Sequence, residues 1–302
     1  MIEIKTVTDL SAAEKLWRQL SPKKTVYDDW DFRSAFYPEA PYPLLFIAAH
    51  DNISNELLGL LPLQEHPRYG YEFFAEYPSE ESRPFVKPGH EDLIPQLYGA
   101  IPGPGKLSDI SGDDPFTKNF LLEDYKYFLP LKDLASFEDF LTTRLSPKRR
   151  RSLAKEIAAI ELLNPEIHSY HAQDGAEALE RLFILNINNF REDSYLQEDD
   201  RLSWRRLFKS SLDIRLIEIA VAGKVIAVSF AILYNGTWDY MLTGAAFKDY
   251  PGLGKYLVKI NIEAAISSGA KTFDAGLGDC GWKHNWHFDR REQYELEVKS
   301  KK

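Results

Sequence analysis

The pattern of apolar and polar positions divides the chain into helices and strands. An apolar stripe at helical spacing predicts a helix from Asp9 to Leu20, and a shorter stripe predicts another over 30–36. Two apolar runs, 44–50 and 57–63, flank a polar turn and predict a β-hairpin. Further elements of this half are predicted at 2–7, 71–74, 91–98, 107–110, 125–131 and 137–144. The first half is therefore expected to mix α and β structure around a central hairpin.

A second series of elements begins at Ser146. Ser146 can cap a helix, Pro147 fits its first turn, and apolar residues at helical spacing continue to Ile160. Asp174 and Glu177 have the spacing of a capping box, which predicts another helix start. Strands are predicted at 166–172, 214–221, 225–234, 237–246, 271–275 and 293–298, and helices up to 190 and at 199–210, 253–268 and 282–287. Chain length and this order predict two α+β domains, 1–145 and 146–302.

A glycine turn stands out in the second half. The strand 237–246 is followed by Pro251, Gly252 and Gly254, and a helix begins near Leu253. The glycines allow close backbone approach, and the N–H groups at a helix start attract anions. This pattern predicts a phosphate site, although a helix start without a ligand explains it as well.

Composition and charge narrow the functional classes. The formal net charge of −9 disfavours DNA and anionic membranes as partners. Apolar runs are too short for a membrane span, and the first residues lack a signal-peptide pattern. The single Cys280 excludes an internal disulfide and indicates a cytoplasmic protein. His284 and His287 beside Asp279 and Cys280 invite a metal site, but ligands crowded into one aromatic loop argue against it.

Two stretches of the second half carry a family resemblance. They are Tyr250-Pro-Gly-Leu-Gly-Lys-Tyr-Leu257 and Phe273-Asp-Ala-Gly-Leu-Gly-Asp-Cys-Gly-Trp-Lys-His-Asn-Trp286. The second is similar to the Asp-x-x-x-Gly-Asp-x-x-Tyr-Lys-x-x-Trp pattern of the FemAB-like branch, which includes CelD-type acetyltransferases, with Trp282 in place of Tyr. With the order of elements from Glu166 onward, they resemble the GNAT acyltransferase superfamily. Because Leu57-Leu-Gly-Leu-Leu-Pro-Leu63 looks like a strand of that branch's N-terminal domain, the resemblance implies tandem GNAT-like domains, the first one degenerate.

The resemblance implies transfer of an acyl group to an amine, with acetyl-CoA or another acyl-CoA as donor and no metal. The turn would hold the pyrophosphate, and the end of the preceding strand would bind the pantetheine or the thioester carbonyl. The implied donor-binding residues are Ala245, Ala246, Lys248, Gly252, Leu253, Gly254 and Lys255. Asp249 stands where GNAT enzymes often have Arg or Gln, and its charge repels phosphate. This departure leaves room for aminoacyl-tRNA, the donor of Fem-type relatives.

The resemblance also implies catalytic candidates. They are Asp239, Tyr240, Asp279, Lys283 and His284. Asp279 would orient Lys283 or accept the substrate ammonium, and the alternative is a helix-capping Asp279 beside a solvated Lys283. Side chains alternate along a strand, so only one of Asp239 and Tyr240 can face a cleft, and a solvated Asp239 is an alternative. His284 either packs or acts as a general base.

The sequence therefore favours an N-acyltransferase that acts on a small amine such as an amino sugar or amino acid. A Fem-like, aminoacyl-tRNA-dependent transferase is one alternative, and a non-catalytic GNAT-like binding protein is another. The basic run from Lys148 to Arg151 would suit tRNA or a phosphate, although a solvated helix turn explains it equally. Oligomeric state is left open.

Overall fold

The computed structural model describes residues 1–37, 42–113, 116–191, 194 and 196–299. It divides the chain into two compact units, Met1–Lys126 with Arg291–Lys302, and Tyr127–Arg290. The chain leaves the first unit within β7 (Leu121–Pro130) and returns to it within β13 (Asp289–Val298). The domain ranges 1–145 and 146–302 stay a prediction from the sequence.

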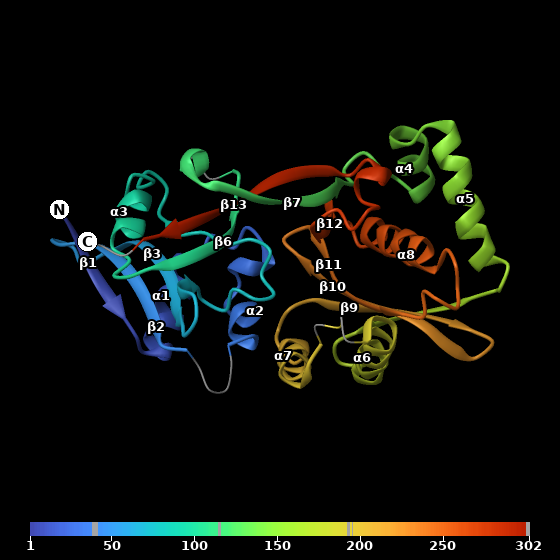
Figure 1. Ribbon diagram of the computed structural model, residues 1–302, viewed down its shortest axis with the longest axis horizontal. Coiled ribbons are helices and arrows are strands. Elements are labelled where there is room, and N and C mark those ends of the chain that lie inside the picture. The colour runs from blue at the N-terminus through green and yellow to red at the C-terminus, as the bar shows by residue number, and fades with distance from the viewer. Residues whose placement is uncertain (38–41, 114–115, 192–193, 195, 300–302) are drawn as a thin grey trace. The chain divides into compact units, whose positions relative to one another are not determined.

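The first unit is a sheet with helices, and its strand order is β1-β2-β3-β4-β6-β13, with β5 on β3 (Figure 1). The predicted hairpin is confirmed: β2 and β3 are antiparallel, with Ile47 opposite Leu61 and both fully buried. The elements are β1 (Ile2–Val7), α1 (Leu10–Leu20), η1 (Val26–Asp28), α2 (Trp30–Ala35), β2 (Leu44–Asp51), β3 (Leu57–His66), β4 (Gly70–Phe73), β5 (Phe85–Val86), α3 (Leu93–Gly99), β6 (Gly105–Ser111) and η2 (Thr117–Asn119). The sequence did not predict β5, because a strand of two residues carries no periodicity.

A buried arginine joins separate segments of the first unit. Arg33 on α2 is 3% exposed, and its guanidinium donates five hydrogen bonds. The acceptors are the carbonyl oxygens of Tyr27, Phe74, Ala75 and Glu81 and the hydroxyl of Ser82. Desolvation lowers the pKa of Arg33 to about 10, so the group still carries its charge at neutral pH.

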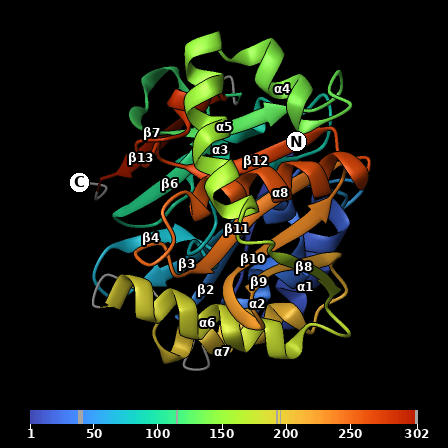
Figure 2. The ribbon, with the colours of Figure 1, turned by 90° about the vertical axis from the view of Figure 1, so that its right-hand side faces the viewer.

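The second unit has the strand order β12-β11-β10-β9-β8. Its pairs are antiparallel except for β11 with β12, which are parallel. In this unit α8 covers one face of the sheet and α6 with α7 the other, while α5 lies across α8 (Figures 1 and 2). The elements are α4 (Phe137–Arg144), α5 (Pro147–Glu161), β8 (Glu166–His171), α6 (Ala176–Phe190), α7 (Glu198–Phe208), β9 (Ile214–Val221), β10 (Lys224–Tyr234), β11 (Thr237–Ala245), α8 (Leu253–Ser267), β12 (Thr272–Leu277) and η4 (His284–Trp286).

Helix starts in the second unit follow the sequence signals in one case and not in another. Ser146 caps α5 by accepting the Arg149 N–H at 3.4 Å, with Pro147 in the first turn, as predicted. The capping box at Asp174 is wrong, because α6 is capped at Gly175 without a side-chain hydrogen bond. A Cβ at Gly175 would lie 2.8 Å from Leu216 Cδ1, so tight packing on the sheet decides where this helix begins.

Candidate functional site

The two parallel strands of the second unit separate partway along their length. β11 pairs with β12 at Thr237, Trp238 and Asp239, and the last paired residue on β12 is Asp274. β11 continues to Ala245 on β10, with a register irregularity between Tyr240 and Leu242 that leaves one extra residue. Such a bulge bends and twists a strand. The bulge therefore lies where β11 turns away from β12, and backbone groups beyond Asp239 on that edge of β11 make no ladder with β12.

The glycine turn begins α8, as predicted, but its glycines are explained by packing. Gly252 has a φ of +94°, and a Cβ there would lie 2.4 Å from the carbonyl oxygen of Glu156 on α5. A Cβ at Gly254 would lie 3.3 Å from the ring of Phe247. The N–H of Leu253 donates to Tyr250 at 3.1 Å. The glycine at this turn therefore allows the backbone to lie close to α5, a neighbour that the sequence did not reveal.

The first-turn N–H groups of α8 are the remaining anion donors. Among the described residues, the N–H groups of Gly254 and Lys255 have no backbone acceptor, as is usual for a helix start. Lys255 carries an ion pair with Glu156 of α5, so its ammonium is already engaged. Lys248 and Asp249 are both exposed on the turn, and neither makes an ion pair within the described ranges. The local field at the turn therefore combines a positive helix end with two opposite and adjacent side-chain charges.

The end of β11 is held tightly by its neighbours. Ala245 is fully buried, and the Ala246 N–H donates to Ile226 at 2.9 Å. Asn186 of α6 donates to the Thr243 carbonyl oxygen at 2.7 Å, and is 1% exposed. The Ala246 N–H is already bonded within the protein, so a donor-binding role for Ala246 would require this hydrogen bond to break. The role of Ala245 stays a prediction. Sequence reasoning missed Asn186 because a single polar residue in a helix gives no sign of its partner.

An aspartate–histidine pair lies in the loop after β12. One Asp279 carboxylate oxygen accepts the His284 backbone N–H at 2.7 Å, and the other contacts the His284 ring Nδ1. Desolvation opposes ionisation of Asp279, but the backbone and imidazole hydrogen bonds from His284 outweigh it and hold its pKa below the ordinary value. The His284 side chain is 62% exposed, so its other ring nitrogen can meet a ligand. Asp279 thus accepts the first N–H of η4, although the N-cap residue of that short helix is Lys283, without a side-chain capping hydrogen bond. The same contacts give Asp279 and His284 a geometry suited to proton transfer.

Lys283 is buried, so the expectation of a solvated side chain is wrong. It is 4% exposed, and its ammonium donates to the carbonyl oxygens of Gly276 at 3.0 Å and Leu277 at 2.6 Å. The ammonium also lies 5.7 Å from the ring centroid of Tyr127. Sequence patterning could not detect this burial, because the aromatic and backbone partners come from separate elements.

Asp239 and Tyr240 point to opposite faces of the sheet, as alternation requires. Asp239 is 2% exposed and lies beside Asp274 in the parallel register, so a solvated Asp239 is also wrong. Tyr240 stacks on Phe273 with ring centroids 5.6 Å apart, and its oxygen accepts the Thr243 hydroxyl at 2.7 Å. Asp239 and Asp274 therefore lie on one face of the β11–β12 pair, and Tyr240 lies on the other, near the point where the two strands separate.

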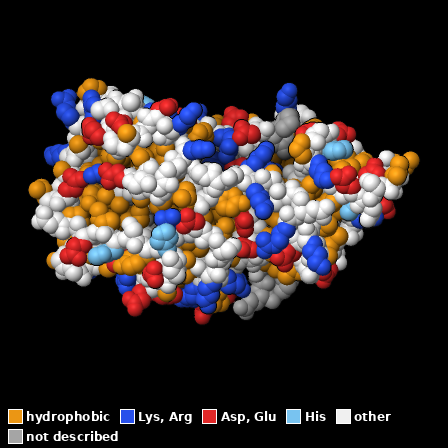
Figure 3. All heavy atoms as spheres, turned by 180° about the vertical axis from the view of Figure 1, so that it is seen from behind, with side chains coloured by type: hydrophobic (Ala, Val, Ile, Leu, Met, Phe, Trp, Pro, Cys, Tyr) orange, Lys and Arg blue, Asp and Glu red, His pale blue; other side chains and the backbone are white. Residues whose placement is uncertain are grey.

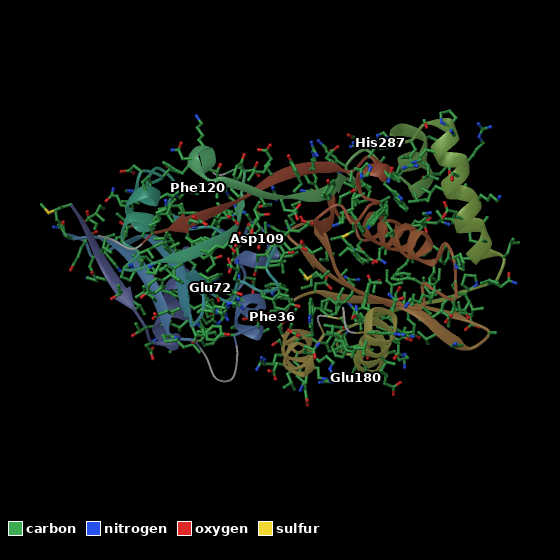
Figure 4. The ribbon with its side chains drawn as sticks, in the orientation of Figure 1. Phe36, Glu72, Asp109, Phe120, Glu180 and His287 are labelled. Carbon is green, nitrogen blue, oxygen red and sulfur yellow. The ribbon has the colours of Figure 1, made fainter. Side chains whose placement is uncertain are left out.

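Aromatic side chains support the loop that carries His284. Trp286 stacks on Phe140 of α4 at 6.0 Å and meets Trp282 edge-on at 5.6 Å. Figure 4 shows His287 on this loop beside α4, and its side chain is exposed. No group of three or more His, Cys, Asp or Glu side chains suited to a metal ion occurs among the residues that the structure describes.

The surface in view carries charges of both signs. Figure 3 shows Lys and Arg side chains interspersed with Asp and Glu over the face in view. Within the described ranges, no helix is both long and apolar enough to cross a membrane.

Part of the second unit matches a known protein family in sequence. Residues 147–284 match the family model described as "Acetyltransferase (GNAT) domain". No curated protein matches the chain in sequence.

Solved structures with similar folds extend over nearly the whole chain. L-PGS from Bacillus licheniformis has 12% identity and a TM-score of 0.63, covering 99% of this chain and 95% of that one. FemX has 10% identity and a TM-score of 0.60, covering 98% and 97%. A tandem GNAT protein from the clavulanic acid biosynthesis pathway has 9% identity and a TM-score of 0.54, covering 100% of both chains. Mixed α/β structure with a tandem GNAT-like fold is thus confirmed, and residues 147–284 of the chain match a GNAT acetyltransferase domain.

Proposed function

We propose that the protein is an N-acyltransferase that moves an acyl group from acetyl-CoA or another acyl-CoA to the amine of a small molecule, such as an amino sugar or amino acid. The separation of β11 from β12 after Asp239 and Asp274 carries this proposal. β11 leads to the turn and α8, which would bind the donor, and β12 leads to the loop with Asp279 and His284. A donor threaded between the strands would meet both sets of residues.

The donor would be held mostly by backbone groups. Unpaired edge groups of β11 near Ala245 would bind the pantetheine, and the N–H groups of Gly254 and Lys255 would bind the pyrophosphate. Lys248 would add a positive charge, and Asp249 would oppose it. The family match supports this arrangement, since it includes the turn and the start of α8.

The chemistry needs a proton acceptor and an oriented donor. His284, held by Asp279, would take a proton from the acceptor ammonium, and the neutral amine would attack the thioester carbonyl carbon. Collapse of the tetrahedral intermediate breaks the carbon–sulfur bond and releases the CoA thiolate, and loss of the second proton from the nitrogen to solvent leaves the neutral amide. Tyr240 lies where the strands part, and its hydroxyl is the candidate proton donor to that thiolate. The thioester is already activated, so no covalent enzyme intermediate is required.

Charge changes on the turn test donor binding. Asp249→Asn removes one negative charge and should strengthen acetyl-CoA binding by about five- to tenfold, because one charge about 7 Å from a pyrophosphate contributes about 1 kcal/mol in a solvent-like dielectric. Lys248→Glu reverses a charge, a change of two units, and should weaken binding by about 25- to 100-fold. Titration calorimetry measures both effects. Lys224→Glu, on the exposed β9–β10 turn, is the matched control and should bind like the wild type. Equal affinity in all three variants would remove the turn from the donor site.

Turnover with a panel of amines tests the catalytic assignment. Asp279→Asn and His284→Gln should each lower kcat by at least about tenfold while acetyl-CoA binding stays unchanged. Wild-type rates in both variants would exclude the pair from proton transfer.

A Fem-like transfer from aminoacyl-tRNA is the second candidate, and α5 favours it. Lys148, Arg151 and Lys155 share the exposed side of α5 and make no ion pair within the described part of the chain. Binding of bulk tRNA that weakens steeply with salt, without acetyl-CoA binding, would support this candidate. Binding of neither ligand would instead favour the non-catalytic alternative.

A further inference from the structure

Asp274 and Lys283 hold one short segment of backbone from two sides. The Asp274 carboxylate accepts the Gly276 N–H at 2.8 Å. The Lys283 ammonium donates to the Gly276 carbonyl oxygen at 3.0 Å and to the Leu277 carbonyl oxygen at 2.6 Å. Asp274 is 9% exposed and Lys283 is 4% exposed. Two buried charged side chains thus hydrogen-bond to Gly276, near the end of β12.

The loop that follows needs such support. Gly276, Gly278, Cys280 and Gly281 have φ values of +77°, +66°, +49° and +74°. Glycine-rich backbone loses much conformational freedom when it is ordered, and a left-handed conformation at a non-glycine residue is unfavourable. Asp279 lies in the middle of this run. Without strong hydrogen bonds at its base, the loop would sample many conformations that separate Asp279 from His284.

Lys283 also joins the loop to the turn after it. Its backbone carbonyl oxygen accepts the N–H groups of Trp286 at 3.2 Å and Phe288 at 3.3 Å, and its own N–H donates to Asp279 at 3.3 Å. Burial of an ammonium is costly unless its protons find acceptors, and here they bind backbone carbonyls. The Lys283 ammonium is therefore held by backbone carbonyl oxygens inside the protein.

We propose that Asp274 and Lys283 are positioning residues, which clamp the Gly276 segment so that the Asp279 carboxylate stays in contact with the His284 imidazole. This inference rests on the proposed function for its catalytic meaning, because the pair matters to chemistry only if it moves the proton of the acceptor. Lys283 acts through the loop in this assignment, whereas a directly catalytic Lys283 stays a prediction from the sequence.

Two substrate-free measurements on the full chain test the clamp. Lys283→Met and Asp274→Ala should each raise amide hydrogen exchange in 277–284 by at least about tenfold. Both should also raise the pKa of Asp279 toward that of an unpaired aspartate, followed by NMR on protein labelled with ¹³C-aspartate. Asp274→Asn keeps an acceptor oxygen for the Gly276 N–H and should stay close to the wild type in both measurements.

Asp274→Ala separates the clamp from simple electrostatics. Loss of a nearby negative charge by itself would lower the pKa of Asp279, whereas release of the loop raises it. Unchanged exchange or a lowered Asp279 pKa in this variant overturns the proposal, even if Lys283→Met fails to fold. Because neither readout uses a donor or acceptor, failure of the acyltransferase proposal would leave these results interpretable, and failure of the clamp would leave donor binding untouched.

Discussion

Replacement of Gly252 by alanine tests whether this glycine serves the fold or a ligand. Its φ of +94° is unfavourable for any residue with a Cβ, which costs about 1–2 kcal/mol. The new Cβ would also lie 2.4 Å from the Glu156 carbonyl oxygen, and relief of such overpacking between α8 and α5 costs about 1–3 kcal/mol. We therefore expect Gly252→Ala to destabilise the protein by about 2–5 kcal/mol.

Gly254→Ala is the matched control. Gly254 lies two residues after Gly252, in the first turn of α8, and its Cβ would meet only the Phe247 ring at 3.3 Å. Alanine is a better helix former than glycine by about 1 kcal/mol, which offsets a small adjustment of the ring. This variant should therefore stay within about 1 kcal/mol of the wild type.

Urea denaturation followed by tryptophan fluorescence measures both variants. If Gly252→Ala unfolds like the wild type, the close approach to α5 is not a feature of the folded protein. Loss of acetyl-CoA binding at unchanged stability would then mean that the glycine is required by the ligand. A stability loss confined to Gly252→Ala supports the packing explanation.

The remaining predictions concern buried polar groups. Desolvation raises the pKa of Glu76 to about 8 and that of Asp109 to about 7, so between about pH 4.5 and pH 8 the folded chain holds protons that the unfolded chain has lost. Stability should therefore fall as pH rises through this window, and Glu76→Gln should flatten the slope in thermal melts at several pH values. Arg33→Met should cost about 3–5 kcal/mol in urea titrations, because it leaves buried carbonyl oxygens without a donor; a loss below about 1 kcal/mol would contradict this. Asn261 donates to the Ser229 hydroxyl at 2.9 Å between α8 and β10, so Asn261→Leu should cost about 1–3 kcal/mol. The double variant with Ser229→Ala should recover part of that loss, and strict additivity in the double-mutant cycle would argue against the contact.

The order of helices and strands could be read from the sequence because it depends on local periodicity. Apolar spacing located α8. The pair Asn235-Gly236, which is typical of tight hairpin turns, joins β10 to β11 with φ values of +52° and +80°. Gly269 follows the end of α8 with a φ of +73°, the left-handed conformation that glycine commonly adopts just after a helix. In each case the decisive interactions lie within a few residues.

The state of the charged site residues depended on residues far away in the chain. Lys255 meets Glu156, which is 99 positions distant, and Lys283 is buried against Tyr127. Burial of a charge requires partners from other elements, and no spacing rule in one segment reveals them. The opening between β11 and β12 has the same origin, because it follows from the register of two strands joined through α8.

Local sequence patterns were enough to predict most of the elements, the glycine turn and the candidates Asp279 and His284. The packing of Gly252 on α5, the burial of Asp239 and Lys283, and the contact of Asp279 with the His284 imidazole emerged only from the three-dimensional structure. Local preferences are set by neighbouring residues, which the sequence contains directly. Burial, ion pairing and strand separation are set by packing between distant segments, and these come into being only when the chain folds.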